Sequence, residues 1–220
     1  MNNLIIAHRG IHDNNDIPEN SILAFKEAIK RNIAIELDLQ LTKDNVLIVF
    51  HDDNLKRMTN KDILVKDISY NELKKLKLLN TKETIPTFNE ALKIINGKVL
   101  IDIEIKNTKL IKTISKKVMN ELYNYNYPYF IKSFNPKIIR YFYKHYPNIK
   151  RGLLIKDNFY NTILGKLILL YCKPNFLAIS KKIINKYKNN KYDLFIWTIK
   201  DKNEMNNFKN ITNNYICNIK

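Results

Sequence analysis

The feature that most restricts the fold of this chain is a regular alternation of short apolar runs with segments of helical periodicity. Eight apolar runs are assigned to strands, and a helix or a crossover separates consecutive runs. The runs are residues 4–7, 33–42, 99–105, 129–134, 149–155, 176–180, 194–199 and 215–219. Ser21 and Pro86-Thr87 mark the starts of two of the helices. This alternation, at this count, predicts an α/β fold of the (β/α)8 TIM-barrel type.

Two parts of the chain depart from the simple repeat. The second strand runs into Lys43-Asp44-Asn45, a turn signal, and a further apolar run at 46–50 follows. So short a connection joins only antiparallel strands. Lysine-rich residues 54–80 come next, with one short helix predicted at 70–78. We therefore expect a small hairpin and helical insertion at approximately 39–85. No eighth helix follows the last strand, so we expect residues 54–80 or another subunit to cover that side.

Length and composition fit a single domain spanning residues 1–220. The chain is 45% hydrophobic, which is enough for one large core. Its net charge of +17 comes mainly from lysines spread along the chain, as A/T-rich codon usage would produce. Arginine, the residue that most often makes bidentate hydrogen bonds to bases, is scarce. We therefore expect no nucleic-acid partner. Peripheral contact with an anionic membrane stays open.

Neither the cysteines nor the apolar segments indicate secretion or membrane insertion. The two cysteines form no disulfide or metal framework. The first ten residues lack the features of a signal peptide, and the most apolar segment, 163–171, is too short to cross a bilayer. We therefore expect a cytoplasmic protein without a transmembrane segment. The sequence leaves its oligomeric state undetermined.

The stretch 33–53 predicts a cluster of functional side chains. Glu36 and Asp38 are two residues apart on one strand, so both carboxylates point to the same face. Folding the hairpin about Asp44 brings His51 opposite Leu37, beside these carboxylates. The alternative is an exposed hairpin edge with solvated acids. It fits less well, because the acids interrupt an otherwise apolar strand.

In a (β/α)8 barrel, function gathers at the carboxyl ends of the strands. The polar or aromatic residues expected there are His8, Arg9, Glu36, Asp38, His51, Glu104, Lys106, Ser133 and Trp197. Three carboxylates without cysteine, and with histidines not spaced as a zinc set, favour Mg²⁺ or Ca²⁺. A divalent metal, two cations and two histidines together suit a phosphate ester as substrate.

Two readings are open for each of four further or already named residues: Glu19, Asp102, Ser133 and Trp197. Glu19 either favours the dipole of the first helix or faces the site. Asp102 is either a hydrogen-bonding partner in the core or a site residue. Ser133 has no histidine partner in the sequence, so its hydroxyl is expected to line the pocket rather than to act as a nucleophile. Trp197 either lines the pocket or belongs to the barrel core.

A set of motifs in one order resembles the glycerophosphodiester phosphodiesterase family. The motifs are HRG at 8–10, PENS at 18–21, ELDLQLTKDNVLIVFHDD at 36–53, EIK at 104–106, SFN at 133–135 and WTIK at 197–200. Each tripeptide is weak alone, but the ordered set is specific and runs from His8 to Cys217. Two departures are a longer loop before PENS and Tyr215-Ile216-Cys217-Asn218 as the closing strand motif.

The resemblance implies a TIM barrel that hydrolyses glycerophosphodiesters to sn-glycerol 3-phosphate and an alcohol with a divalent metal. It places Glu36, Asp38 and Glu104 at the metal positions and His8 and His51 at the general acid and base positions. It also implies that Arg9 and Lys106 hold phosphate. Lysophospholipase D-like activity on lipid substrates at the same site is the alternative. A catalytically dead binding protein is disfavoured, because both histidines and all three acids are present.

Overall fold

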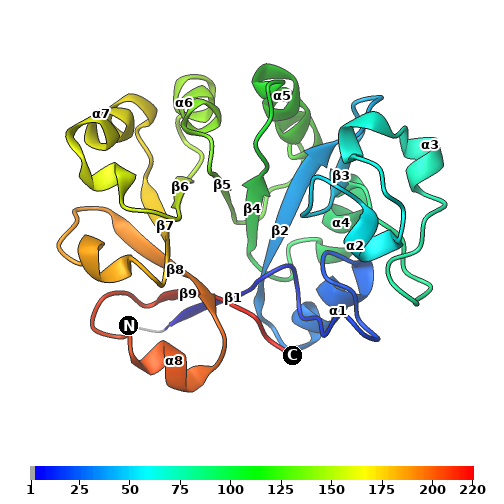
Figure 1. The fold of residues 1–220 in the computed structure, drawn as a ribbon, viewed down its shortest axis with the longest axis horizontal. Coiled ribbons are helices and arrows are strands. Elements are labelled where there is room, and N and C mark those ends of the chain that lie inside the picture. Colours follow the sequence, from blue (N-terminus) through cyan, green and yellow to red (C-terminus); the bar gives the residue numbers. More distant parts are fainter. Residues whose placement is uncertain (1–2) are drawn as a thin grey trace.

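Eight parallel strands close into a barrel in the computed structural model, which describes residues 3–220 (Figure 1). They are β1 (Leu4–Ala7), β2 (Ala34–Leu41), β4 (Ile101–Ile105), β5 (Tyr129–Ser133), β6 (Arg151–Ile155), β7 (Phe176–Ser180), β8 (Asp193–Ile199) and β9 (Asn214–Cys217). Closure follows from β1, which pairs in parallel with β2 on one side and with β9 on the other. The predicted (β/α)8 barrel is confirmed.

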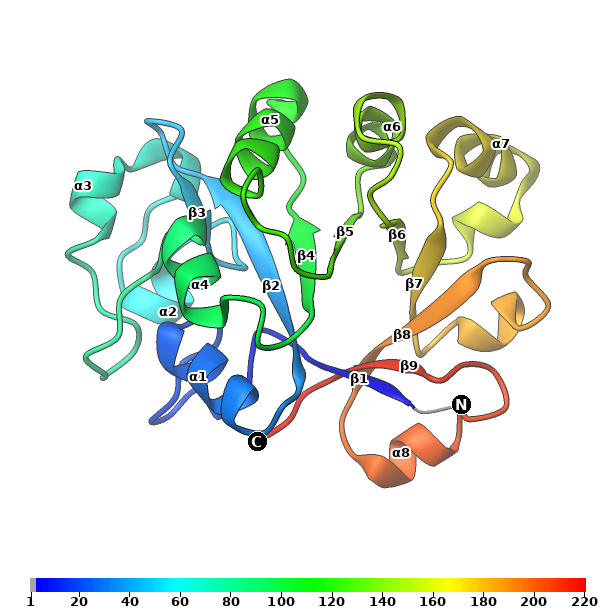
Figure 2. The ribbon, with the colours of Figure 1, turned by 180° about the vertical axis from the view of Figure 1, so that it is seen from behind.

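Helices on the outside connect most of the strands (Figure 2). They are α1 (Ile22–Lys30), α4 (Phe88–Ile95), α5 (Ile111–Glu121), α6 (Pro136–His145), α7 (Ile163–Cys172) and the short α8 (Lys202–Asn206). The 3₁₀ turn η2 (Phe159–Asn161) precedes α7, and η3 (Ile184–Tyr187) alone joins β7 to β8. The predicted starts are confirmed, because Ser21 Oγ accepts from Ala24 N and Thr87 forms a capping box with Glu90.

The predicted hairpin and insertion follow β2. Strand β3 (Leu47–Val49) pairs antiparallel with β2, and α2 (Lys56–Thr59), η1 (Val65–Asp67) and α3 (Tyr70–Leu73) come after it. The helix predicted at 70–78 ends at Leu73, because the chain then turns and brings Leu78 into the same apolar cluster as Leu73. This cluster packs against β3 through Ile48. Residues 54–80 therefore lie on the β2 side of the barrel, and the expectation that they cover the last strand is wrong.

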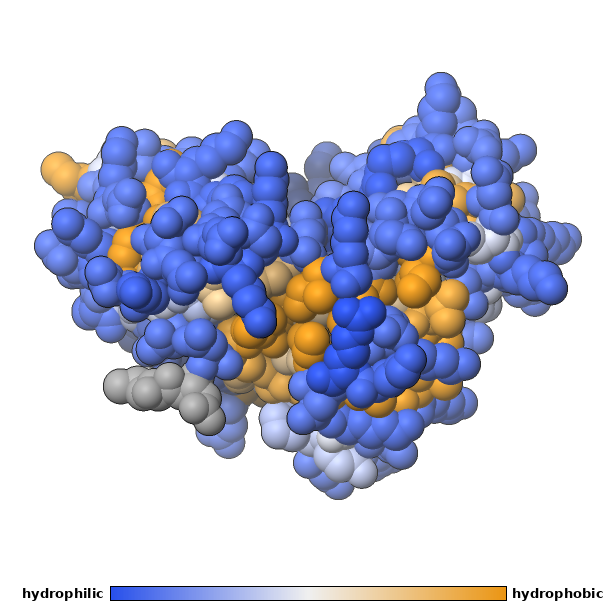
Figure 3. Space-filling model, turned by 90° about the horizontal axis from the view of Figure 1, so that it is seen from below, coloured by the Kyte–Doolittle hydropathy of each residue, from blue (hydrophilic) through white to orange (hydrophobic). Residues whose placement is uncertain are grey.

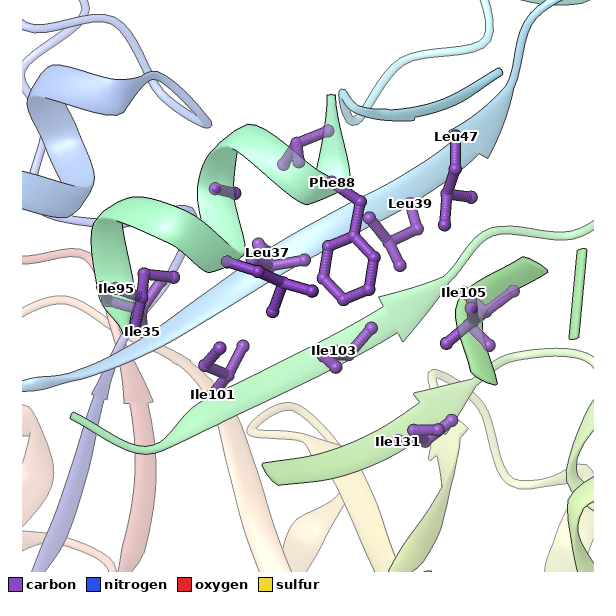
Figure 4. Close-up of a cluster of buried hydrophobic side chains, with 14 of the residues drawn as sticks. Ile35, Leu37, Leu39, Leu47, Phe88, Ile95, Ile101, Ile103, Ile105 and Ile131 are labelled. Atoms are coloured by element: carbon purple, nitrogen blue, oxygen red, sulfur yellow. The ribbon is translucent and has the colours of Figure 1, made fainter. Parts of the chain in front are cut away.

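On β2 and β4, strand periodicity separates an apolar outer face from a polar inner face. Ile35, Leu37 and Leu39 of β2 are fully buried and pack, with Ile103 of β4, beneath Phe88 of α4 (Figure 4). Alternate residues of a strand point to opposite faces. The intervening acids of β2 and β4 therefore point into the barrel.

The other half of the barrel interior is filled by apolar and aromatic side chains. Phe176, Phe195 and Leu154 are buried in one cluster there, and the rings of Phe176 and Phe195 lie 4.5 Å apart between centroids. Gly152 of β6 makes room for them, since a Cβ atom at this position would come within 2.1 Å of the Phe176 ring. The acids of β2 and β4, with Lys132 of β5, thus lie on one side of the barrel, and these rings lie on the other.

No helix follows β9 among residues 3–220, as the sequence predicts. Three residues follow β9, and Ile5 and Ile219 stay half-buried against the core. On the side of the molecule where α8, β9, β1 and α1 lie, apolar side chains gather in the centre (Figure 3). Arg31 donates to the Lys220 carbonyl at 3.0 Å and ties the last residue to α1.

Candidate active site

Three acids from neighbouring strands meet inside the carboxyl end of the barrel. β2 and β4 pair in parallel with Asp38 opposite Glu104, so these side chains share a face with Glu36. One carboxylate oxygen from each of Glu36, Asp38 and Glu104 lies within 4.8 Å of the other two, and all three residues are buried. The structure therefore brings together the three carboxylates that the sequence singles out as metal ligands.

Cations and an amide surround this carboxylate group. Lys106 Nζ lies 2.9 Å from Glu104 Oε1 and 3.5 Å from Asp38 Oδ1. Asn20 Nδ2 donates to Asp38 Oδ2 at 2.9 Å. Burial opposes ionisation of Asp38, but Lys106, His51 and Arg9 outweigh it and hold the pKa of this carboxyl well below its usual range. Asp38 is therefore ionised throughout the neutral range.

The pKa of Glu104 is shifted in the opposite direction to that of Asp38. Burial, together with the negative charge of Asp38, raises the pKa of Glu104 to about 7. Three oxygen donors, gathered out of water and with this much mutual repulsion, match the ligand preference of Mg²⁺ and Ca²⁺. A divalent cation fits this donor set, because its charge offsets the repulsion that the protein cations balance only in part.

Arg9 reaches the site from an unusual backbone conformation. Arg9 has φ +60° and Gly10 has φ +78°, so the chain turns back sharply after β1. A Cβ atom at Gly10 would lie 2.9 Å from Ala24 Cβ, which explains why glycine follows Arg9. The turn lets Arg9 N donate to Glu36 Oε2 at 2.9 Å, while Nη1 contacts Glu19 Oε1 at 2.8 Å. The HRG motif thus serves backbone geometry as well as charge.

Both predicted catalytic histidines are held through the same ring atom. His8 Nδ1 lies 2.8 Å from Asn218 Oδ1, and His51 Nδ1 lies 2.7 Å from Asp52 Oδ1. Because amide and carboxylate oxygens only accept, each Nδ1 donates and each Nε2 is left for chemistry. Burial lowers the pKa of His8, with Glu36 acting in the opposite direction. The charges of Glu36 and Asp38 act on His8, and that of His51 acts on Asp38, so both rings border the acids.

Arg57, which sequence reasoning missed, connects the insertion to the site. Its Nη2 lies 2.6 Å from Glu19 Oε1, and its Nε lies 2.6 Å from Asp52 Oδ2. Glu19 is buried, which opposes ionisation, yet Arg57, Arg9 and Asn14 lower its pKa to about 2. Of the two readings of Glu19, its contacts favour the one that faces the site. Arg57 is the one arginine of lysine-rich residues 54–80, and that is the signal in the sequence that points to it.

A second missed residue, Lys132 of β5, lies buried at the centre of the charged half. Its Nζ contacts Asp102 Oδ2 at 2.7 Å and Glu36 Oε1 at 3.1 Å. Asp102 is thus a core partner, and burial raises its pKa to about 6 although Lys132 opposes this. Strand periodicity indicates that Lys132 points into the barrel, because it lies two residues before the inward Phe134. It is also in register with Glu104.

The structure does not bring Ser133 to the other predicted site residues. Ser133 follows the inward-pointing Lys132, so it points to the opposite face. Its hydroxyl donates to the Ile105 carbonyl at 2.7 Å and accepts from Asn135 N at 3.1 Å. The expectation that this hydroxyl lines the pocket gains no support from this position. Its role in the structure is to join β4 to the start of α6.

Trp197 of β8 lies half-buried with the apolar side chains of the barrel interior. Its ring meets that of Phe134 edge to face at 5.7 Å between centroids, and Nε1 donates to the Ala178 carbonyl at 2.9 Å. It therefore belongs to the interior cluster and also keeps an accessible side near the carboxyl end of its strand.

The carboxyl end of this (β/α)8 barrel gathers three carboxylates, two imidazoles and two cations. This set of groups is typical of a barrel hydrolase that acts on an anionic ester. A family model, described as the glycerophosphoryl diester phosphodiesterase family, matches residues 8–217. The chain belongs to this family, and it is a phosphoric diester hydrolase.

Two named relatives and one solved structure are similar to this chain over most of its length. A glycerophosphodiester phosphodiesterase of Caldanaerobacter subterraneus subsp. tengcongensis is 36% identical, over 93% of this chain and 89% of its own length. A human lysophospholipase D is 28% identical over 81% of this chain and 67% of its own. A solved structure of an Oleispira antarctica phosphodiesterase with the product sn-glycerol-3-phosphate has a TM-score of 0.85 at 24% identity, covering 97% and 92% of the two chains. No helix among residues 3–220 is long and apolar enough to cross a membrane.

Proposed function

We propose that this enzyme hydrolyses glycerophosphodiesters to sn-glycerol 3-phosphate and an alcohol, with a divalent metal and two histidines. The observation that carries the proposal is the group of Glu36, Asp38 and Glu104, whose oxygens lie within 4.8 Å of one another beside His8 and His51. The name of the Caldanaerobacter relative supports the substrate class. The product bound in the Oleispira phosphodiesterase, which shares the fold, is the product expected here.

The protein cations position the phosphate in this proposal. Lys106 and Arg9 lie on either side of Asp38, so their charges converge where a phosphodiester would enter. Mg²⁺ or Ca²⁺ held by the three acids would withdraw charge from a phosphoryl oxygen and lower the barrier to attack at phosphorus. Trp197, on the apolar side of the barrel, gives the glycerol carbons a surface to lie on.

Proton transfer falls to the two imidazoles. One Nε2 takes the proton of the glycerol 2-hydroxyl. The hydroxyl oxygen bonds to phosphorus while the bond from phosphorus to the alcohol oxygen breaks, and a cyclic phosphate forms. The other imidazole protonates that alcohol as it leaves. Water then opens the cyclic phosphate, with the two imidazoles in reversed roles. General acid–base help of this kind contributes about 10²–10⁴-fold, and Asn218 and Asp52 keep both rings oriented for it.

The test follows release of sn-glycerol 3-phosphate from glycerophosphocholine and glycerophosphoglycerol. Enzyme stripped with a chelator is assayed alone and with added Mg²⁺ or Ca²⁺. We expect release to disappear on stripping and to return with at least one of the two ions. Full activity of the stripped enzyme would contradict the metal role, and no release under any condition would contradict the substrate.

A second candidate is lysophospholipase D-like hydrolysis of lysophospholipids, for which the human relative gives specific support. The same acids and histidines would act. The substrate would differ in that its glycerol carries an acyl chain. Parallel assays on glycerophosphocholine and on lysophosphatidylcholine micelles separate the two. Higher kcat/KM on the micelles would favour the lipid substrate.

A further inference from the structure

Helix α7 is apolar on both of its sides. Gly165, Leu169 and Cys172 face the barrel and are buried, as expected for a covering helix. The opposite side carries exposed Ile163, Leu164, Leu167, Leu170 and Tyr171, each at least half accessible and Ile163 at 82%. Their spacing of i, i+1, i+4, i+7 and i+8 makes one continuous stripe. An outward stripe this apolar is unusual on a free surface and marks an interaction site.

The charge of the surrounding chain is strongly one-sided. Residues 137–192 contain thirteen lysines and arginines but one acid, Asp157. The other twenty acids lie outside this segment. Codon bias that favours lysine would add positive charge everywhere, but it would not remove acids from one sector alone. The helical parts of this basic sector (residues 137–192) are α6, η2, α7 and η3, which lie along one edge of the barrel (Figure 1).

Little of this positive charge is neutralised within the protein. Between residues 3 and 220, the ion pairs made by the sector are Lys150 with Asp193 and Lys181 with Glu204. Lys166 is on α7 itself, and Arg140 of α6 lies over the Tyr171 ring at 5.0 Å. The apolar stripe is therefore bordered by unneutralised cations.

We propose that the outer side of α7, with the basic sector around it, docks this enzyme on an anionic lipid surface. An interfacial helix inserts its apolar side at the level of the headgroups while flanking lysines attract anionic lipids. A second copy of this chain is a poorer occupant, because two basic sectors would repel each other across the contact. The apolar stripe matches the acyl-chain boundary of a lipid surface, and the positive border matches its anionic headgroups.

The placement of α7 adds an orientation to this docking. The helix starts just after η2, which leaves the carboxyl end of β6, so its first turn lies on the active-site side of the barrel. Ile163 and Leu164 are in that turn, and Phe159 of η2 is also exposed. Docking through these residues would hold the barrel mouth beside the lipid headgroups, where glycerophosphodiesters and lysolipids occur.

The experiment measures sedimentation of the full chain with vesicles of phosphatidylcholine, alone or with phosphatidylglycerol at about 30 mol%. We expect binding to the anionic vesicles at low salt and at least tenfold weaker binding to the neutral ones. The triple variant Leu164→Gln, Leu167→Gln, Leu170→Gln should bind at least tenfold more weakly than wild type. Its matched control is Leu23→Gln with Tyr123→Gln, which alters exposed apolar residues elsewhere and should bind as wild type does.

Charge is tested in the same way. Lys166→Glu with Lys182→Glu should weaken binding to anionic vesicles, whereas Lys26→Glu with Lys74→Glu, outside the sector, should weaken it much less. Hydrolysis of soluble glycerophosphocholine should be unchanged in all variants, which separates a failed docking proposal from a failed assignment of activity. Equal vesicle binding by wild type and the triple variant would overturn the proposal. Absent vesicle binding, with dimers that the triple variant abolishes, would overturn it in favour of a self-interface.

Discussion

At the residue scale, the site depends on two imidazoles held in place by different partners. His8→Ala and His51→Ala should each lower kcat by about 10²–10⁴-fold, because each removes one proton-transfer group. Asp52→Asn should cause a smaller loss, since the amide can present an NH₂ group to Nδ1 and favour the wrong tautomer. The measurement is kcat on glycerophosphocholine, with His145→Ala on exposed α6 as control. Wild-type turnover in both histidine variants would contradict the assignment.

Loss of Lys132 should destabilise the barrel, because its ammonium is buried between two acids. It is the cation between Asp102 and Glu36, and all three side chains are buried. Lys132→Met removes the cation that Asp102 and Glu36 share and should lower the free energy of unfolding by about 3–5 kcal/mol. Urea unfolding measures this, with exposed Lys137→Met as the matched control. A loss below about 1 kcal/mol would show that the acids find other compensation.

The residues that sequence reasoning could and could not identify differ in a physical way. Glu36, Asp38 and Glu104 could be placed together, because the i, i+2 rule and neighbouring parallel strands fix their relation. Ser133 was expected at the mouth although the same rule, counted from Phe134, puts Lys132 inside instead. The bond from Arg57 to Glu19 joins residues 38 positions apart, and no local pattern encodes such a contact.

At the element scale, the insertion is anchored to the barrel through the buried carboxylate of Glu19. Its pKa falls from 4.5 to about 2 in the folded protein, a difference worth up to about 3 kcal/mol. A depressed pKa stabilises the fold above pH 4.5 and loses that stabilisation as pH falls toward 2. Glu19→Gln should therefore cost about 2–3 kcal/mol at pH 7, and the difference from wild type should shrink between pH 4.5 and pH 2.

Chemical denaturation at pH 7, 4.5 and 3 measures this difference. Asp16→Asn changes an exposed carboxylate in the same loop and serves as the control. A cost for Glu19→Gln that stays constant over this pH range would mean that lost packing, not lost charge, is responsible.

Elements themselves were predictable where periodicity is strong. All eight barrel strands and the capped starts of α1 and α4 follow from local patterns. The docking of residues 54–80 was not predictable, because the leucines there fit any apolar surface. The partner they found, β3, is the nearest along the chain, which keeps the closure of the intervening loop short.

At the scale of the whole molecule, metal binding and barrel stability should be linked. The three acids come from β2 and β4, which are adjacent members of the closed sheet, so a cation there ties two strands of one cooperative unit. A ligand that binds only the folded state stabilises it by about 2.7 kcal/mol at a hundred times its Kd. For a protein of this size, that corresponds to a rise in Tm of roughly 5–10 °C.

Thermal unfolding with Mg²⁺, with Ca²⁺ and with a chelator tests this link without reference to activity. Glu104→Gln removes one charged donor and should reduce the rise in Tm, whereas exposed Asp62→Asn should leave it intact. The pKa of about 7 for Glu104 adds a direction, because a protonated carboxyl is a poor ligand and the rise should be larger at pH 8 than at pH 6. The same Tm in chelator and in either ion would mean that the acids are balanced by Lys106, Arg9 and Lys132 alone.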